Sequence, residues 1–200
     1  MKRIFKENSY DIVRLYVNQL GIMIFSMLLY TAVGSLRDEK LSSTLSIFVS
    51  VFSICFYLVL IYYVVWEIGA KDKIRIDGGR MEPITYKGAL MGTFANVPNL
   101  LLGLLTTVFM IIFLVTRNDG VYAAFLIFNT ITRFHASMYL GVITALVPGA
   151  TNTADINYTE FLVESILFTV IPLISIAVTH LAYYLGSREQ KLLSFISTRK

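Results

Sequence analysis

Four long stretches without a charged side chain constrain the fold of this 200-residue chain more than any other feature. They are residues 15–33, 44–66, 88–116 and 165–187. A membrane-spanning helix needs about 20 mainly apolar residues. The stretches are continuously apolar, whereas strands of a membrane β-barrel alternate in polarity over about ten residues. We therefore predict an all-α, polytopic helical membrane protein with lipid as its main partner.

The spans are expected in a single integral membrane domain, over residues 15–33, 44–66, 98–116 and 161–185. Composition supports this fold class, because 56% of the residues are hydrophobic and only 15% are charged. Globular domains average about 25% charged residues. This composition excludes a disordered tail and a disulfide scaffold. No basic stretch is interleaved with aromatic residues, so no nucleic-acid partner is expected.

A fifth apolar run, residues 121–147, contains Arg133 and His135. Asn129, Arg133 and Ser137 follow each other at intervals of four and would share one helical face. Full crossing would bring Arg133 near the bilayer centre, at a cost of about 2.5–3.5 kcal/mol. We therefore predict four spans and one re-entrant or outer-interfacial helix, with five spans as the alternative.

The distribution of basic residues favours the same topology. Thirteen of the seventeen Lys and Arg residues lie in the N-terminal segment, in residues 71–87 or in the C-terminal tail. Loops on the cytoplasmic side of a membrane are enriched in Lys and Arg. Four spans place all three segments inside, whereas five would place the tail outside and the acidic segment 148–160 inside. The expected location is the bacterial cytoplasmic membrane, with both termini cytoplasmic.

Residues 67–87 form the longest hydrophilic stretch and are predicted to be a charged cytoplasmic loop. Ile74 and Ile76 precede an Asp77-Gly78-Gly79 turn, which indicates a short hairpin. Pro83 disfavours a long helix. The alternative interpretation of this loop is a docking surface for a cytoplasmic protein. The tail after Ser187 is amphipathic, because Leu192, Leu193 and Ile196 alternate with basic residues.

Two prolines interrupt the apolar runs and are candidate hinges. Pro98 is expected to start the third span after a break at Asn96 or Val97, since proline cannot donate to the helix ladder and restricts the preceding residue. A continuous but kinked helix is the alternative. Pro172 lies at the centre of the last span, where a kink is expected.

Polar side chains inside a bilayer are costly, so they define a candidate intramembrane site. Arg133 and Glu164 are expected to pair, either as a structural clamp or as part of a ligand or ion path. His180 and Glu67 would lie at similar depth, as a buried hydrogen bond or a proton relay. Gly88 and Gly92 have the G-x-x-x-G spacing of close helix contacts, and buried amides often join helices. Two such amides are Asn96 and Asn99.

The sequence contains no catalytic motif, no metal-ligand pattern and no cofactor motif, so no cofactor is expected and an enzyme is not favoured. The leading hypothesis is a non-catalytic membrane component that oligomerises or binds a membrane or cytoplasmic protein. The alternative is a subunit of a small-solute transporter or channel. A third interpretation, an enzyme acting on lipid, depends on Glu67, Asp72 and His180.

Overall fold

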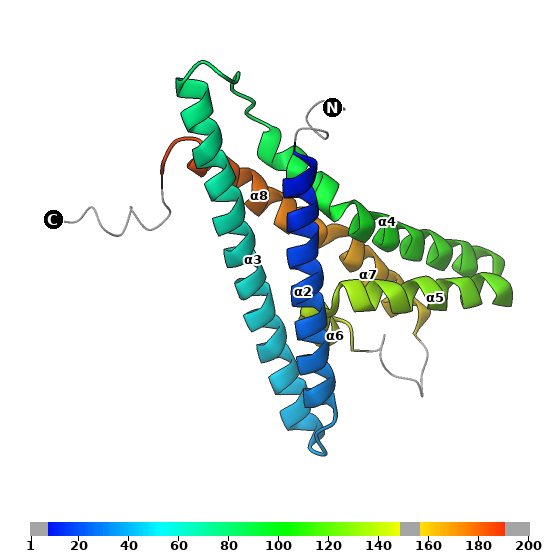
Figure 1. Ribbon diagram of the computed structural model, residues 1–200. Coiled ribbons are helices and arrows are strands. Elements are labelled where there is room, and N and C mark those ends of the chain that lie inside the picture. The colour runs from blue at the N-terminus through cyan, green and yellow to red at the C-terminus, as the bar shows by residue number, and fades with distance from the viewer. Residues whose placement is uncertain (1–7, 149–156, 191–200) are drawn as a thin grey trace. The chain divides into compact units, whose positions relative to one another are not determined.

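The computed structural model describes residues 8–148 and 157–190, and its regular elements there are all helical. The predicted amphipathic tail falls mainly on residues outside this range. Figure 1 shows the described helices in chain order. They are α2 (Ser9–Gly34), α3 (Glu39–Asp77), α4 (Lys87–Thr116), α5 (Asp119–His135), the 3-10 helix η1 (Ser137–Tyr139), α6 (Leu140–Leu146), α7 (Tyr158–Val170) and α8 (Pro172–Gly186).

Four of these segments are long and apolar enough to cross a membrane: α2, α3, α4 and the consecutive pair α7–α8. The fifth apolar run is not one helix. It divides at Ala136 into α5 and the shorter apolar segment Ser137–Leu146. The prediction of an all-α chain with four spanning helices and one additional apolar segment is confirmed.

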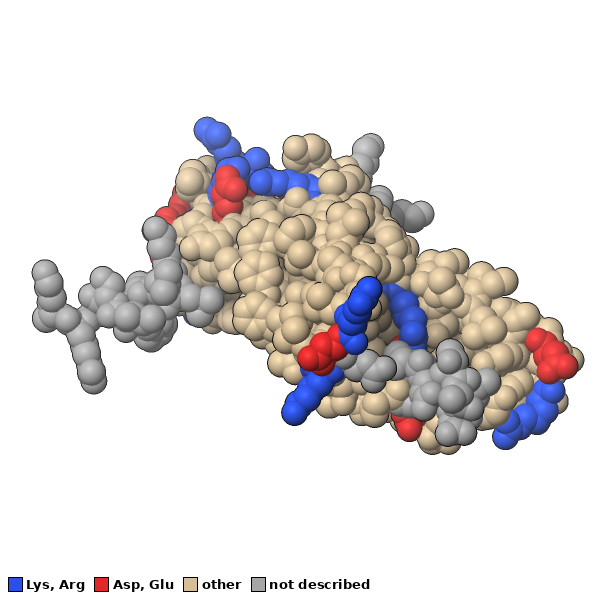
Figure 2. Space-filling model, turned by 90° about the horizontal axis from the view of Figure 1, so that it is seen from below, with Lys and Arg blue, Asp and Glu red and all other residues tan. Residues whose placement is uncertain are grey.

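Large apolar side chains are exposed to an extent that is unusual in a water-soluble protein. Leu28, Phe48, Val115 and Ile127 are each more than 60% exposed. Among the buried residues, by contrast, are many with hydroxyl groups, including Ser26, Ser46, Ser50, Ser53, Thr106, Thr132, Ser165 and Thr179. On the face shown in Figure 2, charged side chains gather in a few places and leave broad uncharged areas. Such a surface is suited to contact with lipid, as expected for a multi-pass membrane protein.

Helix α3 extends to Asp77, so the prediction of a loop over 67–87 with a hairpin is wrong. Charged residues in this stretch support the helix instead, because Lys71 pairs with Glu67 at 2.7 Å and Lys73 pairs with Asp77 at 2.8 Å. Both pairs have the i, i+4 spacing that stabilises helices. The connection to α4 is reduced to residues 78–86.

Helix α4 continues through Pro98, so the predicted break at Asn96 or Val97 is also wrong. A proline removes one backbone hydrogen bond, whereas a break would leave several backbone groups unsatisfied in an apolar solvent. In the last span, where a kink is expected at Pro172, the single residue Ile171 separates α7 from α8. The backbone N–H of Ile171 still donates to the carbonyl of Leu167 at 2.9 Å.

Contacts divide the chain into two compact units. Unit 1 consists of residues 1–17, 57–96 and 173–200. Unit 2 consists of residues 18–56 and 97–172. Two of the boundaries between the units fall next to the candidate hinges Pro98 and Pro172. Each unit has its own packing.

In unit 1, glycines bring α8 into close contact with α3 and α4. A Cβ atom on Gly69 would lie 2.6 Å from the carbonyl oxygen of Tyr183, and one on Gly88 would lie 2.5 Å from the Tyr183 Cβ. A Cβ atom on Gly92 would lie 2.9 Å from the Thr179 Cβ. The close packing predicted from the Gly88–Gly92 spacing is confirmed, since glycine allows two helix backbones to approach.

In unit 2, aromatic packing and hydroxyl pairs join α4, α5 and α7. Met110, Phe113 and Phe125 form a buried core. The hydroxyl groups of Thr106 and Thr132 lie 2.8 Å apart, and those of Thr107 and Thr169 lie 3.1 Å apart. These pairs join α4 to α5 and to α7.

The short segment after α5 is also fixed inside unit 2 by buried polar contacts. The Ser137 hydroxyl donates to the carbonyl of Met23 at 2.6 Å. The backbone N–H of Gly141 donates to the Ser50 hydroxyl at 2.7 Å. Ser137 and Gly141 therefore attach η1 and α6 to α2 and α3, and the segment is anchored at two points.

We expect Gly88→Ala to destabilise the protein although alanine is the better helix former. The added methyl group would meet the backbone and Cβ of α8, and overpacking of this kind costs about 1–3 kcal/mol. Gly21→Ala is the matched control, because no atom lies within 4 Å of its added Cβ. Thermal unfolding in detergent, followed by the fluorescence of Trp66, should show a lower midpoint for Gly88→Ala only. Equal midpoints would contradict the close packing.

Candidate functional site

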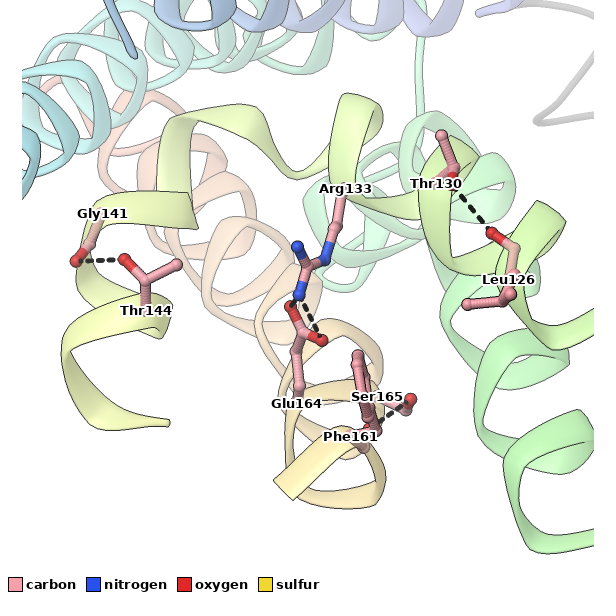
Figure 3. Close-up of polar contacts among 8 residues, drawn as sticks. All are labelled: Leu126, Thr130, Arg133, Gly141, Thr144, Phe161, Glu164 and Ser165. Atoms are coloured by element: carbon pink, nitrogen blue, oxygen red, sulfur yellow. Dashed lines mark hydrogen bonds and ion pairs between the residues drawn. The ribbon is translucent and has the colours of Figure 1, made fainter. Parts of the chain in front are cut away.

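An ion pair between α5 and α7 is the most buried charged feature of unit 2. The Nη2 atom of Arg133 lies 2.7 Å from Glu164 Oε1 and 2.9 Å from Oε2. Figure 3 shows the guanidinium directed at both carboxylate oxygens. The Glu164 residue has no exposed surface, whereas the Arg133 side chain keeps 27% of its exposure. The structure thus brings together the two residues that the sequence analysis paired.

The polar stripe of α5 turns toward the interior of unit 2. Asn129 is buried on the same face of α5 as Arg133. Thr132 and Ser137 are buried and bonded to neighbouring helices. The predicted helical face of Asn129, Arg133 and Ser137 is therefore the face that packs against the rest of the unit.

Such a pair fits a clamp between helices. A buried ion pair offsets the cost of removing two charges from water only when its geometry is good and further hydrogen bonds are present. Arg133 Nη2 contacts both carboxylate oxygens of Glu164. Removing either partner leaves an uncompensated charge, so the pair fixes the position of α5 on α7.

A small, mainly apolar pocket with a few polar residues in its lining lies beside Pro172. Its lining includes the side chains of Gln19, Asn99, Thr132 and His135. The pocket volume is about 20 Å³, which is enough for about one water molecule. Of the candidate residues, Asn99 and Pro172 are therefore brought together here, whereas Asn96 belongs to unit 1.

A second buried polar cluster, in unit 1, was not predicted from the sequence. Asp72 Oδ2 accepts hydrogen bonds from Lys87 Nζ at 2.6 Å and from the Tyr183 hydroxyl at 3.0 Å. The side chains of Asp72 and Lys87 are only 2% and 4% exposed. These residues lie on α3, α4 and α8. No local spacing signals the cluster, because its members are 15 and 111 positions apart in the chain.

The other candidate residues are not assembled into one site. Glu67 is exposed and pairs with Lys71, and no hydrogen bond joins it to His180 within residues 8–148 and 157–190. The Nδ1 atom of His180 is buried without a hydrogen-bond partner in that part of the chain. The Asn96 side chain donates to the carbonyl of Gly92 at 2.9 Å, one helical turn earlier. The candidate intramembrane residues therefore fall into separate groups, with Glu67, Asn96 and His180 in unit 1 and the others in unit 2.

The described residues contain no group of three or more His, Cys, Asp and Glu side chains that could hold a metal ion. Comparisons of the chain with known protein families, with characterised proteins and with solved structures find no match.

We expect Arg133→Met to destabilise the protein more than Glu164→Gln. The arginine change leaves a carboxylate with no exposed surface, whereas the remaining arginine of Glu164→Gln keeps partial access to its surroundings. Breaking a buried pair costs about 3–5 kcal/mol, and the lower end applies here because Arg133 is partly exposed.

Chemical unfolding of both single variants and of the double variant at pH 7 tests this expectation. The double variant should recover part of the loss caused by Arg133→Met, because it leaves no unpaired charge. Strictly additive losses would argue against a coupled pair.

Proposed function

We propose that this protein is a non-catalytic component of the bacterial cytoplasmic membrane, with both termini cytoplasmic, that self-associates or binds a partner protein. The proposed binding site, called the Tyr184 surface, surrounds a hollow of about 240 Å³ in unit 1. The polar and aromatic residues that define it are Lys73, Asp77, Thr85, Tyr183, Tyr184, Ser187 and Arg188.

The observation that carries the proposal is the chemistry of this hollow. The Arg188 guanidinium lies 4.1 Å from the centre of the Tyr184 ring, and Lys73 pairs with Asp77 beside it. Tyrosine and arginine are enriched among the residues that contribute most to protein interfaces. Mixed charges at the edge suit a partner that carries both signs.

Buried contacts hold the Tyr184 surface in position. Tyr183, the neighbour of Tyr184, bonds to Asp72, and Asp72 bonds to Lys87. The indole N–H of Trp66 donates to the carbonyl of Gln190 at 2.7 Å, which ties the chain after Arg188 to α3. A pre-organised surface loses less conformational entropy on binding.

The distribution of basic residues supports a cytoplasmic position for the Tyr184 surface and the rest of the hydrophilic part of unit 1. Within the described residues, seven of the eleven Lys and Arg residues belong to unit 1. These are Arg14, Lys71, Lys73, Arg75, Arg80, Lys87 and Arg188. Positively charged segments remain on the cytoplasmic side during membrane insertion.

A photoreactive amino acid at Thr85 or Tyr184 should capture the partner in intact cells. A product of twice 22.6 kDa indicates self-association, and another fixed mass indicates a different partner. The control is the same amino acid at Val115, which is 79% exposed and lies in the apolar part of α4.

The captured product should disappear with Arg188→Glu, since this change removes the stacked cation of the Tyr184 surface. Absence of a product at Thr85 and Tyr184, or the same products at Val115, would contradict partner binding at this surface.

The small pocket at Pro172 favours transport as a second candidate function, because interrupted helices line substrate sites in many transporters. Under the proposal above, purified protein in liposomes should carry no proton current, measured with a trapped pH-sensitive dye, beyond that of empty liposomes. A current that is lost in Asn99→Leu, with thermal stability retained, would favour the transporter instead.

A further inference from the structure

A wide cavity in unit 1 lies along the 78–86 connection between α3 and α4. Its volume is about 1050 Å³, comparable with the upper range of small-molecule sites. The polar lining consists of Asn8, Arg75, Arg80, Glu82, Tyr86 and Lys87. Ile76, Met81 and Ile84 add apolar surface.

Two arginines reach this cavity because of the way α3 ends. The N–H of Gly79 donates to the carbonyl of Ile76, and the N–H of Arg80 donates to the carbonyl of Arg75, both at 2.9 Å. Gly79 has a φ of 68°. These are the hydrogen bonds of a Schellman motif, which reverses the chain after a helix. The turn therefore holds the backbone of Arg80 next to that of Arg75.

The cavity lining carries more positive than negative charge, because three basic residues and one acidic residue line it. Lys87 is already bonded to Asp72, which also accepts from Tyr183. Arg75 approaches the same carboxylate only at 3.5 Å, and its side chain is 63% exposed. Arg80 has no ion pair within the described residues. Two guanidinium groups thus have free donors, and Glu82 is the one acidic residue in the lining.

We propose that this cavity binds a phosphate group, supplied by the headgroup of an anionic phospholipid. Guanidinium groups bind phosphate through paired hydrogen bonds. The apolar lining suits the glycerol and upper acyl chain of a lipid, which a free phosphate ion lacks. The cavity also lies between the end of one spanning helix and the start of the next, and basic pockets at such positions bind anionic headgroups.

Arg75 and Arg80 have a purely structural alternative, because cations near the C-terminus of a helix stabilise it through the helix dipole. That role predicts a loss of thermal stability on substitution and no dependence on lipid. Binding of phosphate predicts the opposite: a small effect on the protein alone and a loss of ligand-dependent stabilisation.

The test compares the full chain, purified in a neutral detergent, with its Arg75→Gln/Arg80→Gln variant. Native mass spectrometry measures binding of phosphatidylglycerol, of zwitterionic phosphatidylcholine and of inorganic phosphate. The charge-matched control is Arg37→Gln/Lys40→Gln, which removes two exposed cations of unit 2. Thermal unfolding without lipid checks that each variant folds.

Phosphatidylglycerol should bind the wild type and the control alike, and about tenfold more weakly for each arginine removed. Glu82→Gln should strengthen binding, because it removes the acidic residue of the lining. Phosphatidylcholine should not reproduce the dependence on the arginines.

Arginine-dependent binding of inorganic phosphate without phosphatidylglycerol binding would overturn a lipid as the source. Equal lipid binding by all variants would overturn the site itself. The inference does not depend on the proposed protein partner, since that partner is tested by crosslinking at Thr85 and Tyr184 and not by lipid binding.

Discussion

The requirement to satisfy polar groups inside an apolar solvent governs this structure. Lipid hydrocarbon forms no hydrogen bonds, so a partner within the protein lowers the cost of burying a polar group. Arg133 and Glu164 meet this requirement across two helices, and the paired threonines of α4 meet it with their neighbours on α5 and α7. These contacts determine how the helices of unit 2 pack.

Close backbone contact replaces the hydrophobic force that holds water-soluble helices together. Lipid chains are as apolar as leucine, so helix association depends on van der Waals contact and hydrogen bonds. In unit 1 the glycines at 69, 88 and 92 bring α8 against α3 and α4. This approach also places the Tyr183 hydroxyl next to Asp72, where Lys87 completes the cluster.

The two units use charge in different ways. In unit 2 the Arg133–Glu164 pair joins two helices of the fold, and the polar stripe of α5 packs on the same buried side. In unit 1 the buried cluster supports an open, charged surface, with the Tyr184 surface and the arginine-lined cavity flanking the 78–86 connection. We therefore propose that unit 1 carries the binding surfaces, whereas the buried pair of unit 2 serves packing.

The sequence alone predicted a membrane protein with four long apolar helices, because the length and mean hydropathy of each run can be read directly from consecutive residues. It also predicted the Arg133–Glu164 pair, from the cost of an unpaired charge in lipid, and the close helix contact at Gly88 and Gly92, from their spacing. The loop prediction for residues 67–87 was wrong because i, i+4 ion pairs support a charged helix as far as Asp77. The predicted break at Pro98 was wrong because lipid penalises a broken helix more than the loss of one hydrogen bond. Only the tertiary structure decided that Asp72 meets Lys87 and Tyr183, because distances between helices far apart in the chain have no local signature.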